Sequence, residues 1–278
     1  MVPWNYYSPM VIVAASDQHL GSDRSDKSSF DGFLDQILAD TTITHFVLLG
    51  DVVDMWRRDA SGVFLENRTT FDKIALIAEK INVHYVYGNH DYHLRYLEDH
   101  SYPFKFRPEL PLHEDGRKYK FVHGCQFDDL MKKAKPLLDP LCRVMSDDMG
   151  NYESALWAML TRDPSDLEYF SYPISEKREI LEKVEELLQK PEVRLAGRTL
   201  DAIEKEACNC VDPGEILVFG HTHVPFINKS GTVVNTGCWV KDAPIHNTYV
   251  RLDADGPRLF EFRKGDITEK VRRQIGGR

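Results

Sequence analysis

Five short apolar segments of this chain each end at a polar motif, and this repeated arrangement constrains the fold more than any other sequence feature. The segments cover residues 11–15, 45–49, 83–87, 119–122 and 215–219. Such short apolar runs are typical of strands buried on both faces of a sheet. The motifs that follow them are Asp17-Gln18-His19, Gly50-Asp51-Val52-Val53-Asp54, Gly88-Asn89-His90-Asp91, His123-Gly124 and Gly220-His221-Thr222-His223. Because sites in α/β sheets gather beyond the carboxyl ends of strands, we expect these motifs to converge.

The stretches between the strands predict the rest of the organisation. Apolar residues recur at helical spacing over residues 27–40 and 69–82, which predicts crossover helices of a layered α/β fold. Between residues 123 and 215 the alternation stops, and periodic stretches broken at prolines predict a helical insertion. Two antiparallel hairpins are predicted over residues 225–235 and 247–264. We therefore expect a core of residues 1–124 and 215–265, a helical cap of residues 125–214 and a polar tail of residues 266–278.

Seven side chains of the motifs carry the donor atoms of metal ligands. They are Asp17, His19, Asp51, Asn89, His123, His221 and His223. Seven groups are too many for one ion, but two ions that share a bridging carboxylate can use them all and keep an open position. Asp51 is the expected bridge, because its strand should lie between the strands that end at Asp17 and Asn89. Oxygen and imidazole ligands favour manganese, with iron or zinc as alternatives.

This layout resembles the calcineurin-like metallophosphoesterase superfamily. The resemblance implies an α/β/β/α sandwich with an inserted helical cap, and two divalent metal ions as cofactors. It also implies two ligand sets that share one carboxylate, namely Asp17, His19, Asp51 and His223 for one ion, and Asp51, Asn89, His123 and His221 for the other. In the family, the histidine at the position of His90 faces the substrate, and the carboxylate at the position of Asp54 orients it.

Within the superfamily, the motif layout is most similar to the UDP-2,3-diacylglucosamine hydrolase branch. Residues Gly50 to Trp56 match its Gly-Asp-x-x-x-x-Trp pattern, and the insertion after His123, with Asp128-Asp129 close behind, has a similar position and character. That hydrolase carries Arg where His90 stands, so its particular substrate does not carry over. The Ser/Thr protein phosphatase branch is less similar, since it expects other residues after the second and third motifs.

Charge bears on the class of substrate. The chain has a formal net charge of -9, and the insertion, with 12 Lys and Arg against 19 Asp and Glu, accounts for -7 of it. Proteins that bind nucleic acid need a basic stripe to displace counterions, and none is visible here. We therefore expect a small or lipid-like phosphate substrate rather than nucleic acid. One or two of the basic residues near the motifs could bind a nonbridging phosphate oxygen. The candidates are Arg24, Lys27, Arg57, Arg58 and Arg95, and Arg57 is preferred because it follows Trp56.

The predicted activity is hydrolysis of a phosphoric ester or pyrophosphate bond by a metal-bridging hydroxide. His90 would contact the phosphoryl group or protonate the departing oxygen. Apolar residues of the cap, among them Leu156, Trp157, Met159 and Leu160, would contact an organic leaving group. A metal-dependent nuclease of the same superfamily is the enzymatic alternative, and a non-enzymatic scaffold is the other class. A scaffold is disfavoured because the chain keeps all seven ligands and His90.

Cellular location is predicted from weaker features. The first 16 residues lack the pattern of a signal peptide, and no apolar run approaches the length of a transmembrane helix. The five cysteines are odd in number and include no Cys-x-x-Cys pair, which is typical of reduced thiols. These features predict a cytoplasmic protein and leave its oligomeric state open.

Overall fold

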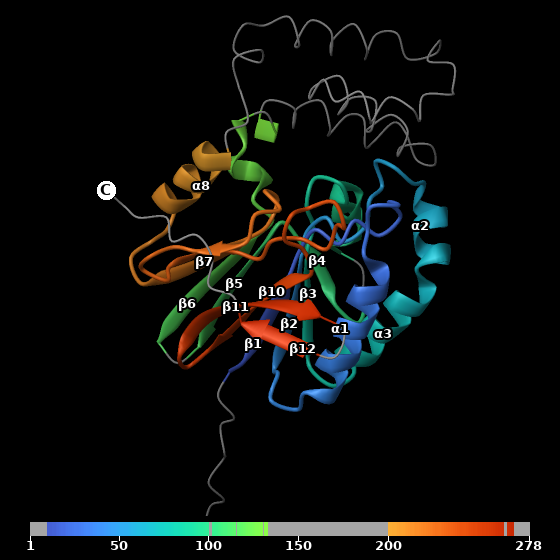
Figure 1. The fold of residues 1–278 in the computed structure, drawn as a ribbon, viewed down its shortest axis with the longest axis horizontal. Helices are drawn as coiled ribbons and strands as arrows, with labels where there is room; N and C mark the ends of the chain where they lie inside the picture. Colours follow the sequence, from blue (N-terminus) through green and yellow to red (C-terminus); the bar gives the residue numbers. More distant parts are fainter. Residues whose placement is uncertain are drawn as a thin grey trace, which may run out of the picture.

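Two β-sheets stacked between helical layers form the fold (Figure 1). The structure is a computed structural model that describes residues 10–99, 102–114, 116–129, 131–132, 200–263 and 266–269. The seven-stranded sheet has the order β12-β11-β10-β1-β2-β3-β4, and the five-stranded sheet has the order β5-β6-β7-β9-β8. In chain order the elements are β1 (Ile12–Ala15), α1 (Lys27–Ala39), β2 (His45–Leu49), α2 (Ala60–Glu66), α3 (Arg68–Ala78), β3 (Asn82–Val86), η1 (Tyr92–Leu97), β4 (Lys105–Arg107), β5 (Glu109–Glu114), β6 (Arg117–Val122), η2 (Cys125–Phe127), α8 (Leu200–Asn209), β7 (Glu215–Phe219), β8 (Phe226–Ile227), β9 (Val233–Asn235), β10 (Thr248–Asp253), β11 (Gly256–Arg263) and β12 (Asp266–Glu269).

Side chains of the central strands alternate between two cores, as the two-residue period of a strand requires. In β1, Val13 and Ala15 pack with the residues of α1 and α3, whereas Ile12 and Ala14 pack between the two sheets. Strand β2 alternates in the same way and pairs in parallel with β1 on one side and β3 on the other. The expected central place of the strand that precedes Asp51 is therefore confirmed.

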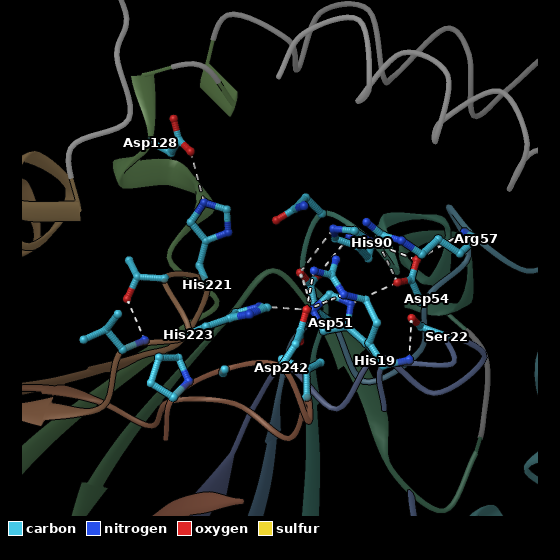
Figure 2. Close-up of a pocket in the computed structure, with 17 residues that line it drawn as sticks. His19, Ser22, Asp51, Asp54, Arg57, His90, Asp128, His221, His223 and Asp242 are labelled. Carbon is cyan, nitrogen blue, oxygen red and sulfur yellow. Dashed lines mark hydrogen bonds and ion pairs between the residues drawn. The ribbon is translucent and has the colours of Figure 1, made fainter. Parts of the chain in front are cut away.

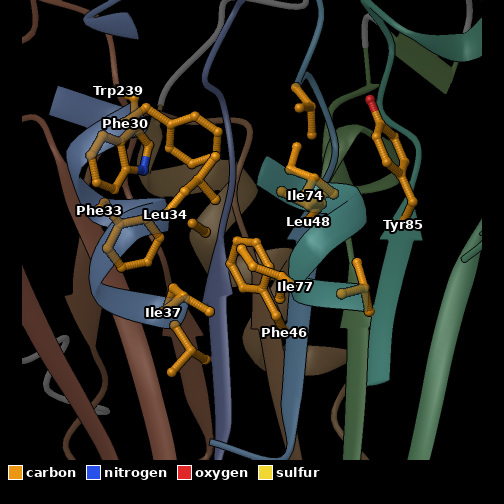
Figure 3. Close-up of a cluster of buried hydrophobic side chains, with 14 of the residues drawn as sticks. Phe30, Phe33, Leu34, Ile37, Phe46, Leu48, Ile74, Ile77, Tyr85 and Trp239 are labelled. Atoms are coloured by element: carbon orange, nitrogen blue, oxygen red, sulfur yellow. The ribbon is translucent and has the colours of Figure 1, made fainter. Parts of the chain in front are cut away.

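Helices cover the outer faces of both sheets. Figure 3 shows the core beneath α1, where the rings of Phe33 and Trp239 lie 4.9 Å apart between their centroids. On the opposite side of the molecule, α8 packs Ile203 and Ala207 against the five-stranded sheet. The order of layers is thus helix, sheet, sheet, helix, which confirms the expected α/β/β/α architecture. None of the helices in the described ranges combines the length and the apolar character that crossing a membrane would require.

Several elements differ from the sequence-based expectations. Residues 266–269, expected in a polar tail, form β12 and pair with β11 at the edge of the larger sheet. The second crossover helix ends at Ala78, four residues early, because the chain must turn before β3 begins. The short elements α2, β4 and β5 were not predicted. Most of the expected cap, including Leu156, Trp157, Met159 and Leu160, lies outside the described residues.

Candidate metal centre

The polar motifs of both sheets converge at one edge, as expected. Asp17, Asp51 and Asn89 follow the adjacent parallel strands β1, β2 and β3, whereas His123 and His221 follow the adjacent parallel strands β6 and β7. Backbone hydrogen bonds hold these strand ends together. The N–H of Asp17 donates to the carbonyl of Gly50 over 3.0 Å, and the N–H of Gly220 donates to the carbonyl of His123 over 2.8 Å. The two sheets meet where the N–H of His221 donates to Oδ2 of Asp17, 204 positions away in the sequence.

The candidate ligands form overlapping groups whose donor atoms all lie within 4.8 Å of one another. One group consists of Asp17, His19 and His223, and a second consists of Asp51, His123 and His221. A third group joins His19, Asp51 and His90. The Nε2 atom of His223 lies 3.2 Å from Oδ1 of Asp17, and Nε2 of His123 lies 3.1 Å from Oδ2 of Asp51. The structure therefore brings the predicted acidic and imidazole ligands into two adjacent clusters.

Several buried polar atoms at these clusters lack a well-aligned hydrogen-bond partner, although two of them lie 3.1 and 3.2 Å from an atom of an oppositely charged group, as donor atoms gathered for an ion would. Among the described residues, the buried donor or acceptor atoms without such a partner include Oδ1 of Asp17, Oδ1 of Asn89 and Nε2 of His123. The opposite atoms of two of these groups are engaged. Oδ2 of Asp17 accepts from the N–H of His221 over 3.0 Å, and Nδ1 of His123 lies 3.1 Å from the carbonyl oxygen of Leu49. The donor set therefore fits metal ions.

Charge in the clusters is closely balanced between carboxylates and imidazoles. Burial alone would lower the pKa of His123, but the carboxylates of Asp51 and Asp17 outweigh burial and raise that pKa to about 10. Burial would raise the pKa of Asp51, yet His123 and His90 lower it. Asp51 is therefore ionised, and the cationic form of His123 marks a place where positive charge is stabilised.

The backbone at the motifs is unusual. Six described residues other than glycine have a positive φ angle, and five of these are candidate ligands. The five are Asp17, His19, Asp51, His221 and His223, with φ between 48° and 65°. Asp and His tolerate this left-handed region better than most residues, but only as single residues in turns. Such turns at the strand ends direct the ligand side chains toward each other.

His90 lies beside the clusters and contacts the carboxylate of Asp54 (Figure 2). Its Nδ1 atom is 3.0 Å from Oδ1 of Asp54, and its ring stacks on Trp56 with centroids 3.8 Å apart. The other oxygen of Asp54 lies 3.1 Å from Nδ1 of His19 and accepts from Arg57 over 2.8 Å. Asp54 therefore holds His90, His19 and Arg57 together, whereas the family resemblance implied only its contact with His90.

A cavity of about 410 Å³ opens over this arrangement. Its lining includes nine residues singled out in the sequence, namely His19, Arg24, Asp51, Asp54, Arg57, Asn89, His90, His221 and His223. Asp17 and His123 are fully buried and do not line it. One wall was not predicted: Val240 and the residues at 242–244 line it, and Val240 forms an antiparallel bridge with Ser25. That wall has no motif, because it depends on pairing between distant segments.

The basic residues near the motifs separate into two sets. Arg24 and Arg57 line the cavity, and Arg24 donates to Asp242 over 2.6 Å at its rim. The other three lie elsewhere in the described part of the chain: Lys27 pairs with Asp31, Arg58 with Glu66, and Arg95 stacks on Tyr92 and Tyr96. Of the five candidates for a phosphate clamp, two remain at the site.

Asp128 also lines the cavity, and the sequence did not assign it a role. It follows η2 at the start of the insertion, and its Oδ2 atom lies 3.2 Å from Nε2 of His221. A carboxylate behind a metal-ligand histidine orients its ring. The sequence offers no signal for this contact, because Asp128 and His221 are 93 positions apart.

Comparison with known proteins agrees with this geometry. A family model described as calcineurin-like phosphoesterase matches residues 10–225, which is well over half of the chain. A predicted phosphoesterase from Streptococcus pneumoniae TIGR4 is similar at 17% identity over 95% of this chain and 98% of that one, with a TM-score of 0.36. A dimetal phosphatase from Danio rerio has 10% identity over 96% and 98%, with a TM-score of 0.43.

Vacuolar Protein Sorting 29 from Cryptosporidium parvum has 16% identity over 95% of this chain and 99% of that one, with a TM-score of 0.41. TM-scores this low do not by themselves establish a shared fold. No curated protein matches the chain. The match of the family model, together with clustered metal-ligating side chains, shows that this chain belongs to the calcineurin-like phosphoesterase family and is a metal-dependent phosphoesterase.

Proposed function

We propose that this enzyme uses two metal ions to hydrolyse a phosphoric ester or pyrophosphate bond of a small or lipid-like organic molecule. The observation that carries the proposal is that Oδ1 of Asp17, Oδ1 of Asn89 and Nε2 of His123, which follow three different strands, are buried without a well-aligned hydrogen bond beside the acidic and imidazole clusters. A single ion cannot use all the ligands around that region, whereas two ions that share Asp51 can. Manganese is the proposed metal, with iron or zinc as alternatives.

Each proposed ion has four ligands from the protein. Asp17, His19, Asp51 and His223 would hold one, and Asp51, Asn89, His123 and His221 would hold the other. When bound, the ions supply Lewis-acid polarisation of the phosphoryl group and a water acidic enough to act as the nucleophile. His90 would contact the phosphoryl group or protonate the departing oxygen, with its ring held between Asp54 and Trp56. Arg57, fixed on Asp54, would bind a nonbridging oxygen.

The substrate class rests on charge and on the insertion. The net charge of -7 over residues 125–214 disfavours a nucleic acid strand, and the described part of the chain lines the cavity with two arginines, Arg24 and Arg57. The Gly-Asp-x-x-x-x-Trp pattern supports kinship with the UDP-2,3-diacylglucosamine hydrolase branch, which acts on a nucleotide-linked lipid. The proposal therefore favours an organic phosphodiester or pyrophosphate, and the nuclease reading remains the enzymatic alternative.

The two-metal proposal is tested by Asp51→Asn. Because Asp51 is the shared carboxylate, we expect the variant to lose both ions and its activity together. The metal content of the wild type, measured by elemental analysis, should approach two ions per chain. Asp72→Asn, which makes the same change on the exposed surface of α3, should keep both. Full metal content and normal turnover in Asp51→Asn would refute the shared-carboxylate site.

The substrate class is tested by a panel that contains an aryl phosphate, an aryl phosphodiester, a nucleotide-linked pyrophosphate and single-stranded DNA. We expect the diester or pyrophosphate to have the highest kcat/KM. Truncation of the insertion between residues 133 and 199, which leaves Asp128 and α8 in place, should reduce cleavage of that substrate more than cleavage of the aryl phosphate, which needs only the metals and His90. Preferential degradation of single-stranded DNA, with a steep dependence on salt, would establish the nuclease function instead.

A further inference from the structure

Asp128 lies at the root of the insertion and contacts a proposed metal ligand. Its Oδ2 atom is 3.2 Å from Nε2 of His221, and the two side chains are only 6% and 8% exposed. Figure 2 shows the Asp128 carboxylate above the His221 ring, on the side away from Asp51. Since Nε2 faces the carboxylate, Nδ1 is the nitrogen that remains for a metal ion shared with Asp51 and His123.

Two of the other candidate ligands have a comparable partner behind the ring. Nδ1 of His19 lies 3.1 Å from Asp54, and Nδ1 of His123 lies 3.1 Å from the carbonyl oxygen of Leu49. An acceptor at the far nitrogen fixes the tautomer of a ligand histidine and orients its ring. The backbone N–H of His221 donates to Oδ2 of Asp17, which fixes the main chain at this residue. Asp128 fixes the remaining freedom, which is the rotation of the imidazole ring.

The position of Asp128 depends on both ends of the insertion. Immediately before it, Phe127 packs in the core with Ile203 and Ala207 of α8, the helix by which the chain returns to β7. One turn later, Lys132 bridges Asp129 and Glu206 of α8 at 3.2 and 3.4 Å. The two ends of the insertion therefore meet beside the carboxylate that contacts His221.

We propose that Asp128 is a positioning residue that accepts the Nε2 proton of His221, directs Nδ1 toward the second metal ion and thereby links the root of the insertion to metal binding. The inference rests on the proposed two-metal function. It predicts that Asp128 acts on the affinity for one ion and not on substrate binding. A residue that served only the fold would instead change the stability of the metal-free protein.

The test compares Asp128→Ala, Asp128→Asn and Asp72→Asn in the full chain. Asp72 lies on the exposed surface of α3, so its variant carries the same charge change without the contact to His221. Calorimetric Mn²⁺ titration of the metal-free proteins should show one of two sites loosened by about 10–100-fold in Asp128→Ala. We expect a smaller effect in Asp128→Asn, which keeps an acceptor oxygen, and none in Asp72→Asn.

Activity measured against Mn²⁺ concentration gives the second readout. Saturating Mn²⁺ should restore turnover in Asp128→Ala with an unchanged KM, and the metal-free melting temperature should stay at the wild-type value. A raised KM with normal Mn²⁺ affinity would overturn the inference, because Asp128 would then contact the substrate. Normal affinity and activity would also overturn it. If the wild type itself binds fewer than two ions, the two-metal function fails whatever the Asp128 variants do.

Discussion

His90 is the residue whose role separates most clearly from metal binding. It contacts Asp54 and Trp56, and the proposed ligand sets are complete without it. We expect His90→Ala to keep its metals and to lose turnover by about 10²–10⁴, the usual contribution of a positioned acid or base. Elemental analysis beside steady-state kinetics measures both quantities. His90 also lies within 4.8 Å of His19 and Asp51, so a loss of metal in this variant would mean that it is a ligand.

His123 makes metal binding dependent on pH. Burial would lower its pKa, but Asp51 and Asp17 raise it to about 10, so the metal-free ring is protonated at neutral pH. An ion at Nε2 must displace that proton. We expect Mn²⁺ affinity to rise between pH 6 and pH 8 and each chain to release protons as it takes up metal. Calorimetry in buffers of different ionisation enthalpy counts these protons, and binding without proton release would contradict the expectation.

At the scale of the elements, a glycine after β3 gives the central carboxylate its space. A Cβ atom built on Gly88 would lie 2.2 Å from Oδ1 of Asp51 and 2.7 Å from the ring of His123. Gly88→Ala should therefore displace both groups and empty both metal sites. Gly256→Ala, in the β10–β11 turn, meets no atom within 4 Å and should keep its metals. Two ions per chain in Gly88→Ala would show that Asp51 does not need this position.

The elements that the sequence predicted well are those with a continuous apolar pattern. Strand β2 has the predicted bounds, and α1 differs by one residue, because four of its side chains are buried on one face. The missed elements lack such a pattern. Helix α2 has seven residues and buries only Val63, and β4 has three residues and buries only Phe106. Their conformation is determined by the neighbours against which they pack.

The site shows the same limit. The motifs predicted that the candidate ligands converge because each motif follows its own strand, and strand order alone brings Asp17, Asp51 and Asn89 together. The contacts of Asp128 with His221 and of Ser25 with Val240 depend on how distant loops fold back. Neither the periodicity nor the motif spacing of the sequence predicts such contacts, so only the structure reveals them.

For the whole molecule, the ions would connect two sheets. Asp51 follows β2 of the larger sheet, whereas His123 and His221 follow strands of the smaller one. Metal should therefore stabilise the fold against heat. At a free concentration 100 times the dissociation constant, each site contributes about 2.7 kcal/mol. We expect Mn²⁺ to raise Tm by several degrees relative to chelated protein, and Asp51→Asn to show no such rise. Equal Tm values for loaded and chelated wild type would contradict this.

The left-handed turns at the five ligands have a practical consequence for anyone who engineers this protein. Each holds an ordinary L-residue where glycine would fit at lower cost, by roughly 1–2 kcal/mol. A screen for heat resistance of the metal-free protein would therefore reward glycine at a position such as His223, whose side chain is about one-third exposed. Variants recovered in that way would have a higher melting temperature without metal, but they would lack a candidate metal ligand and therefore activity. A library of this enzyme should be ranked by metal content before it is ranked by melting temperature.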